Sequence, residues 1–123
     1  MNEVLLFVAA GLTGLWGVAH LSATKGVVKG FGDISVDNRR IITMEWMVEG
    51  VALLSTAAFV AVAGAIDLTS RVASAVFGVA IAPLVVLAVV SLFTGFRVRF
   101  FAYRLCPLIF TLSAVLIALG AWL

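Results

Sequence analysis

Two glutamates lie in a segment that otherwise suits a lipid environment. Glu45 and Glu49 are four residues apart in the stretch TMEWMVEG, which opens the apolar run 41–65. In a helix that begins at Ile41 they lie ~6 Å and ~12 Å along the axis. An ionised carboxylate deep in a membrane costs roughly 2.5–3.5 kcal/mol, so such a residue faces inward, pairs with a cation or holds a proton. We therefore expect Glu49 to face the protein interior.

Residues on other apolar runs can complete a polar site around these carboxylates. His20 can exchange a proton with a carboxylate, and Arg104 is the expected ionic partner of Glu49. The same side chains can equally form a purely structural clamp between helices. We predict two groups, acid–base residues and ligand-binding residues: Glu49, His20 and Glu45 in the first, and Arg104, Trp46, Tyr103 and Lys25 in the second.

The residue inventory disfavours several other kinds of site. The chain has one histidine and one cysteine, on different apolar runs, which are too few ligands for a typical metal site. We therefore expect no metal. Heme is disfavoured because His20 is its only candidate axial histidine, and a quinone or a lipid remains an open alternative. The single Cys106 excludes an internal disulfide and a CxxC redox pair.

The composition places the elements that carry these residues in a membrane. The chain has 123 residues, of which 64% are hydrophobic and 11% charged, and its mean hydropathy is +1.26. A soluble domain of this length cannot bury so much apolar surface. Runs of roughly 20 apolar residues cross a bilayer as helices. The sequence predicts one all-α integral membrane domain, a four-transmembrane-helix bundle with helices at 4–22, 41–65, 72–95 and 102–123.

The charges predict how this bundle sits in the cell membrane. Seven basic residues lie in or beside the first and third loops, and only Arg71 lies in the second. The positive-inside rule then makes the basic loops cytoplasmic and places both termini on the non-cytoplasmic side. The first loop, 23–40, is the only sizeable polar segment, and we expect Gly26, Gly30 and Gly32 to interrupt any helix through it. Basic residues beside a membrane indicate contact with membrane lipid, and no nucleic-acid partner is expected.

Small residues mark a helix-packing face in the first run. Gly11, Gly14 and Gly17 allow another helix to approach closely. They are also the candidate interface of a homo-oligomer. A polar face of this helix includes Gly17 and three further residues, Thr13, His20 and Thr24.

The layout resembles that of the DoxX-like family of small four-helix bacterial membrane proteins. The similarity lies in the basic first loop, the acid–glycine pair Glu49–Gly50 and the basic, aromatic start of the fourth helix. This resemblance implies an accessory subunit of a quinone-linked or thiosulfate-linked oxidoreductase. A second likeness, to the four-helix sterol isomerases and sigma-2 receptors, implies buried acids, a histidine and a tryptophan around a lipid-accessible cavity.

Three functions follow from these observations. The first is binding of a lipophilic small molecule, quinone-like or isoprenoid-like, in a polar pocket at the cytoplasmic side of the bundle. The second is an enzyme that performs acid–base chemistry on a membrane lipid, as an isomerase does. The third is an oligomeric proton-coupled transporter or channel.

Overall fold

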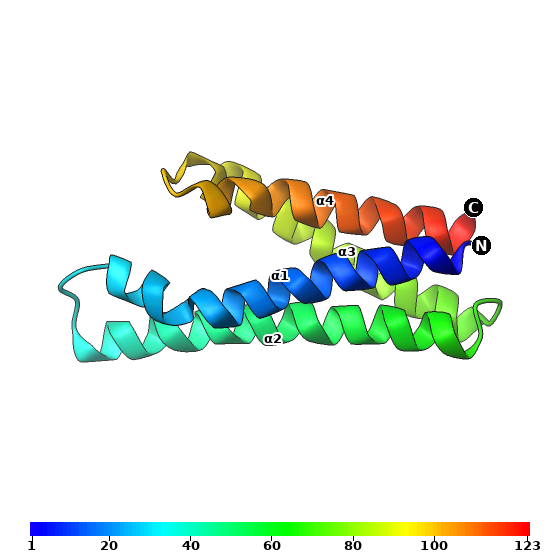
Figure 1. The fold of residues 1–123 in the computed structure, drawn as a ribbon, viewed down its shortest axis with the longest axis horizontal. Coiled ribbons are helices and arrows are strands. Elements are labelled where there is room, and N and C mark those ends of the chain that lie inside the picture. Colours follow the sequence, from blue (N-terminus) through cyan, green and yellow to red (C-terminus); the bar gives the residue numbers. More distant parts are fainter.

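The computed structural model describes all residues, 1–123, as four long helices and one short turn of 3₁₀ helix (Figure 1). The elements are α1 Glu3–Gly30, α2 Val36–Ile66, α3 Arg71–Phe93, η1 Gly95–Arg97 and α4 Phe101–Trp122. Each of the four α-helices is long and apolar enough to cross a membrane. The predicted all-α, four-helix architecture is therefore confirmed.

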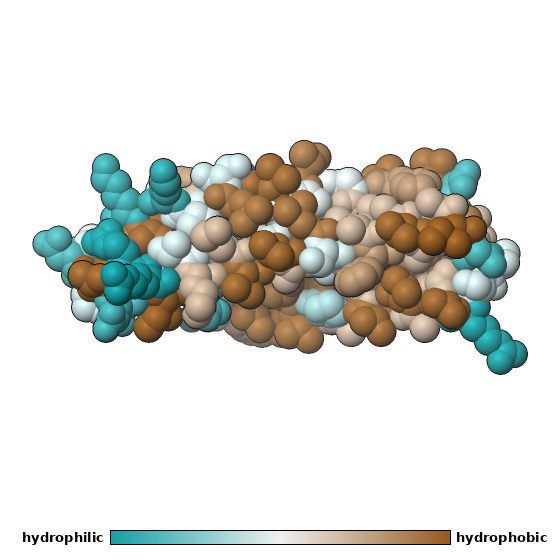
Figure 2. All heavy atoms as spheres, turned by 90° about the horizontal axis from the view of Figure 1, so that it is seen from below, coloured by the Kyte–Doolittle hydropathy of each residue, from teal (hydrophilic) through white to brown (hydrophobic).

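The helices form two antiparallel pairs that lie against each other. α1 runs along α2, α3 runs along α4, and α1 also packs on α4. Both termini lie at one end of the bundle, where the Asn2 N–H donates to the Gly120 carbonyl at 2.7 Å. The α1–α2 and α3–α4 loops lie at the other end (Figure 1). Hydrophilic residues gather towards the ends, and apolar residues cover the long middle of the molecule (Figure 2).

The first two helices extend much further than their apolar runs predict. The predicted polar loop 23–40 is wrong, since α1 continues to Gly30 and α2 begins at Val36. A glycine inside a helix costs only about 1 kcal/mol, which tertiary contacts of the extension can offset. Thr24 and Val28, both in this extension, are buried.

The chain reverses in a loop of five residues, 31–35. Gly32 has φ 71°, a left-handed conformation that glycine adopts without strain. Ser35 then begins α2, because its side-chain oxygen accepts the Asn38 N–H at 3.1 Å. Of the glycines predicted to interrupt the helix, only Gly32 does so.

Side-chain hydrogen bonds hold the second loop, 67–70, in place. The Asp67 carboxylate accepts from the Thr69 hydroxyl at 2.7 Å and from the Thr69 N–H at 2.9 Å. These bonds, the hydroxyl first, hold the pKa of Asp67 below its usual value. Ser70 caps α3 by accepting the Ala73 N–H at 3.0 Å. Asp67 thus marks a sharp polar end to α2.

The core runs along the axis between the two helix pairs. Large apolar side chains from all four helices are fully buried there: Leu6, Leu53, Val60, Phe77, Leu84, Phe110 and Ile117. Small residues fill the remaining contacts, including Ala9, Ala73, Ala80 and Ala114. Such small residues allow the close backbone packing by which helices associate in membranes.

The closest approach of α1 and α2 occurs at two glycines. A methyl group on Gly17 would lie 2.9 Å from the Gly50 carbonyl oxygen, and one on Gly50 would lie 3.1 Å from the Gly17 carbonyl oxygen. Neither position has room for a side chain. This contact confirms that α1 carries a packing face, on which the predicted Thr13, Gly17, His20 and Thr24 are all buried.

The same contact changes the interpretation of the glycine stripe. Gly17 faces Gly50 and Leu54, and a methyl group on Gly14 would lie 3.4 Å from the Ala57 Cβ, all within one chain. Only Gly11 has open space beside it. Of the expected oligomer face of Gly11, Gly14 and Gly17, the last two pack against α2 of the same chain, and only Gly11 is open to another chain.

The tight crossing leads to a direct test. Gly17→Ala should lower the free energy of unfolding by about 1–3 kcal/mol, because the new methyl group overlaps the α2 backbone. Gly11→Ala is the matched control and should be neutral or slightly stabilising. Unfolding by sodium dodecyl sulfate in mixed micelles measures both. Equal stability of the two variants would contradict a close Gly17–Gly50 contact.

Candidate functional site

Aromatic side chains from three helices surround His20. The imidazole is 5% exposed and stacks on Trp46 of α2, with ring centroids 4.8 Å apart and planes 23° from parallel. Trp16, one turn earlier on α1, meets it edge-on at 6.0 Å. Tyr103 of α4 contacts the Trp46 ring edge-on at 5.6 Å. The aromatic cluster therefore joins α1, α2 and α4 around one histidine.

Hydrogen bonds fix how His20 is held. The Trp46 indole N–H donates to the His20 carbonyl at 2.7 Å, and the Thr24 hydroxyl donates to the same oxygen at 3.0 Å. His20 Nδ1 lies 3.0 Å from the Trp16 carbonyl oxygen. A carbonyl oxygen only accepts hydrogen bonds, so Nδ1 must be the donor. The ring orientation and the proton on Nδ1 are thus set by the backbone of α1.

The other ring nitrogen faces a glutamate. His20 Nε2 lies 3.5 Å from Glu49 Oε1, an ion-pair distance that is long for a hydrogen bond. Because Nδ1 already carries a proton, the pair is favourable only with one further proton between Nε2 and the carboxyl group. It is either imidazolium with carboxylate or imidazole with carboxylic acid. The geometry of the pair therefore accommodates one shared proton.

Glu49 also borders a large groove between α2 and α3. The groove has a volume of ≈730 Å³, and its side-chain polar groups are Glu45, Glu49, Thr56 and the indole of Trp46. The Thr56 hydroxyl already donates to the Ala52 carbonyl of its own helix at 2.9 Å. Apolar residues and one proline of α3 form the opposite wall, namely Pro83, Leu84, Val86 and Leu87. A pocket that is mostly apolar with a few polar groups is typical of a site for a lipophilic ligand.

A smaller cavity lies on the other side of the aromatic cluster. It has a volume of ≈140 Å³ and lies between α1 and the first turns of α4. Its walls include Trp16, His20, Trp46, Tyr103 and Cys106, but not Glu49. The carboxyl group thus borders the groove and the imidazole borders the cavity. The His20–Glu49 contact connects these two spaces.

The site lies near one edge of the apolar part of the bundle. If Ile66 marks one edge of the hydrocarbon layer, Glu49 lies ~26 Å along α2, close to the far edge of a ~30 Å core. Trp46 and Tyr103 then lie at the interface, where tryptophan and tyrosine are enriched. Glu49 is therefore nearer to the headgroups than its distance from Ile41 suggests.

The structure brings together only part of the predicted site. His20, Glu49, Trp46 and Tyr103 form one cluster, and Glu45 is exposed at the end of the groove. The expected Glu49–Arg104 ion pair is wrong, because Arg104 is exposed and its Nε donates to the Val98 carbonyl at 3.2 Å. Glu49 is paired with His20 instead, and its side chain keeps 34% exposure.

One predicted residue lies away from the site, and one residue of the site is missing from the predictions. Lys25 is exposed on the extension of α1 and lines neither the groove nor the cavity. Trp16 was not predicted, although it contacts His20 through both its ring and its carbonyl oxygen. The available signal was its position four residues before His20, which places both on one face of a helix.

No protein-family model, curated protein or solved structure matches this chain. The similarity to DoxX-like proteins remains a prediction from a few residues.

The His20–Glu49 contact predicts a specific loss of stability. Glu49→Leu should lower the free energy of unfolding by about 1–3 kcal/mol, because it leaves a buried imidazole without its partner. The loss is smaller than for a fully buried pair because Glu49 is partly exposed.

Glu45→Leu is the matched control, since Glu45 is exposed and forms no ion pair. We expect it to leave the free energy of unfolding within about 0.5 kcal/mol of the parent. Unfolding in mixed micelles compares the two variants. Equal losses would show that a general effect of removing a carboxylate outweighs the His20 contact.

Proposed function

We propose that this protein binds a lipophilic small molecule with an oxygen-bearing head, quinone-like or isoprenoid-like, in the groove between α2 and α3. The single observation that carries this proposal is the position of Glu49. Its carboxyl group contacts buried His20 and also borders an apolar groove of ≈730 Å³. The apolar wall accommodates a hydrocarbon tail, and the carboxyl group binds the polar head.

A shared proton allows Glu49 to bind a ligand head group that is a hydrogen-bond acceptor in one state and a donor in another. A carbonyl oxygen needs a donor, which Glu49 supplies when the proton lies on its carboxyl group. A hydroxyl group needs an acceptor, which Glu49 supplies when the proton lies on His20. A quinone and its quinol present these two groups. This adaptability favours a quinone-like ligand over a pure hydrocarbon.

The basic loops support placement of this groove in the cytoplasmic half of the cell membrane. Six of the eight Lys and Arg residues lie in or close to the α1–α2 and α3–α4 loops. Arg104 lies in the first turn of α4, at the same end of the bundle. The positive-inside rule places that end in the cytoplasm and both termini outside. In this setting the protein is an accessory subunit that holds a ligand for a membrane oxidoreductase.

Acid–base catalysis on a lipid is the second candidate function. The observation that favours it is the His20–Glu49 pair itself, in which one group can supply a proton while the other receives one. Turnover that is lost in Glu49→Gln without loss of binding would distinguish it from a binding protein. An oligomeric transporter has less support, because Gly14 and Gly17 pack within the chain.

A titration with decylubiquinone tests the proposed function. Quinone binding should quench tryptophan fluorescence, since Trp46 lines the groove. Glu49→Leu should weaken saturable binding by about tenfold, because leucine can neither donate a hydrogen bond to the quinone carbonyl nor accept one from a quinol hydroxyl. The matched control Glu45→Leu should bind as tightly as the parent.

A groove-filling variant separates specific binding from partition into the micelle. Leu87→Phe adds bulk on the α3 wall of the groove without adding an indole to the fluorescence signal. It should abolish saturable quenching while the fold is retained. Quenching that rises linearly with quinone concentration, and equally in all variants, would contradict a quinone site.

A further inference from the structure

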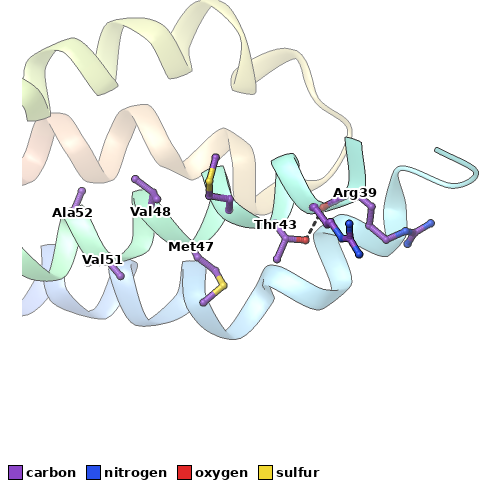
Figure 3. Close-up of a pocket in the computed structure, with 8 residues that line it drawn as sticks. Arg39, Thr43, Met47, Val48, Val51 and Ala52 are labelled. Carbon is purple, nitrogen blue, oxygen red and sulfur yellow. Dashed lines mark hydrogen bonds between the residues drawn. The ribbon is translucent and has the colours of Figure 1, made fainter. Parts of the chain in front are cut away.

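A second face of α2 carries a different combination of residues. Figure 3 shows this face, with Arg39 and Thr43 at one end and Val51 and Ala52 at the other. It is an open surface strip formed by residues of α2 alone: Arg39, Arg40, Thr43, Met44, Met47, Val48, Val51 and Ala52. The face is distinct from the ligand groove, with which it shares only Val48 and Ala52.

The apolar part of this face is uncovered by any other helix. Met44, Met47, Val48 and Val51 are each about half exposed, between 48% and 56%. Methionine side chains are flexible and adapt to irregular apolar surfaces. The strip is therefore suited to contact with a flexible hydrocarbon chain.

The polar end of the face presents two guanidinium groups that are only weakly engaged. Arg39 Nη2 donates to the Gly32 carbonyl at 3.4 Å, near the long limit for a hydrogen bond. Arg40 Nη1 lies 3.9 Å from Asp37 Oδ1, and these side chains are 78% and 88% exposed. Exposed pairs of this kind contribute little energy. Both arginines can therefore turn to a phosphate, whose oxygens match a guanidinium in two parallel hydrogen bonds.

The two parts of the face lie at matching depths in a bilayer. Counted from Ile66 along α2, the segment from Ala52 to Met44 lies ~21 to ~33 Å away, within and at the edge of the ~30 Å hydrocarbon core. Arg39 and Arg40 lie ~40 Å along the axis, or ~37 Å deep with the usual ~20° tilt. That is the level of the headgroups, so the arginines lie directly above the apolar strip.

We propose that this face of α2 binds one anionic phospholipid from the surrounding leaflet. Its phosphate contacts Arg39 and Arg40, and one acyl chain lies along Met44, Met47 and Val51. The argument rests on charge complementarity and on the succession of basic, polar and apolar residues at the depths that a phospholipid presents. It does not depend on the proposed ligand in the groove.

Native mass spectrometry of delipidated protein tests this proposal. Phosphatidylglycerol and phosphatidylcholine with identical acyl chains are added in equal amounts. The parent should retain one phosphatidylglycerol in preference to phosphatidylcholine, and R39Q/R40Q should reduce this preference by roughly thirtyfold, the effect expected of two basic residues at an anionic surface. The matched control R97Q/R99Q removes two arginines beside the α3–α4 loop and should keep the preference.

Two outcomes would overturn the proposal. One is equal retention of the two lipids by the parent protein, and the other is an equal loss in R39Q/R40Q and R97Q/R99Q, which would indicate a general charge effect. A measurement on the unmodified chain covers a failure of R39Q/R40Q to fold. One equivalent of spin-labelled phosphatidylglycerol should broaden the methyl NMR signals of Met44 and Met47 more than the phosphatidylcholine analogue does. Met1 is the internal control, and equal broadening of all three methionines would contradict the site.

Discussion

The contact between Gly17 and Gly50 determines the geometry on which the rest of the site depends. Because neither glycine has a side chain, the backbones of α1 and α2 meet at a distance that no larger residue allows. His20 lies three residues after Gly17, and Glu49 and Trp46 lie one and four residues before Gly50. One close contact therefore places the imidazole against the carboxyl group and the indole. A shift of either helix by one residue would separate them.

This geometry gives each polar group of the buried His20 a hydrogen-bond or ion-pair partner. The Trp16 carbonyl accepts a hydrogen bond from Nδ1–H, Trp46 and Thr24 both donate to the His20 carbonyl, and Glu49 faces Nε2. The polar groups of His20 are thus satisfied within the protein, as buried groups must be in an apolar environment, whereas the buried indole N–H of Trp16 has no hydrogen-bond partner. Of these residues, Glu49 and Trp46 also border the groove. The structure therefore places the His20–Glu49 pair at the edge of the groove.

The sequence predicts the four helices well, because lipid imposes length and apolarity on every span. It also names Glu49, His20, Trp46 and Tyr103 as candidates, and the structure places these four in one cluster. It does not predict the partner of Glu49. α4 is apolar on all sides, so no periodicity fixes its rotation, and Arg104 lies outside the bundle. The polar composition of residues 23–40 suggested a loop, but buried Thr24 and Val28 hold that part of α1 in a helix. Such long-range packing cannot be read from local glycine content.

The protonation of His20 is the most direct measure of whether this cluster exists. His20 is the only histidine in the chain, so ¹⁵N-histidine labelling gives one imidazole to observe by NMR. We expect Nδ1 to carry a proton at neutral pH, and the Nε2 resonance to change in Glu49→Gln and to stay unchanged in Glu45→Gln. A neutral imidazole with its proton on Nε2 and a free Nδ1, unaffected by Glu49→Gln, would contradict both the Trp16 contact and the pairing with Glu49.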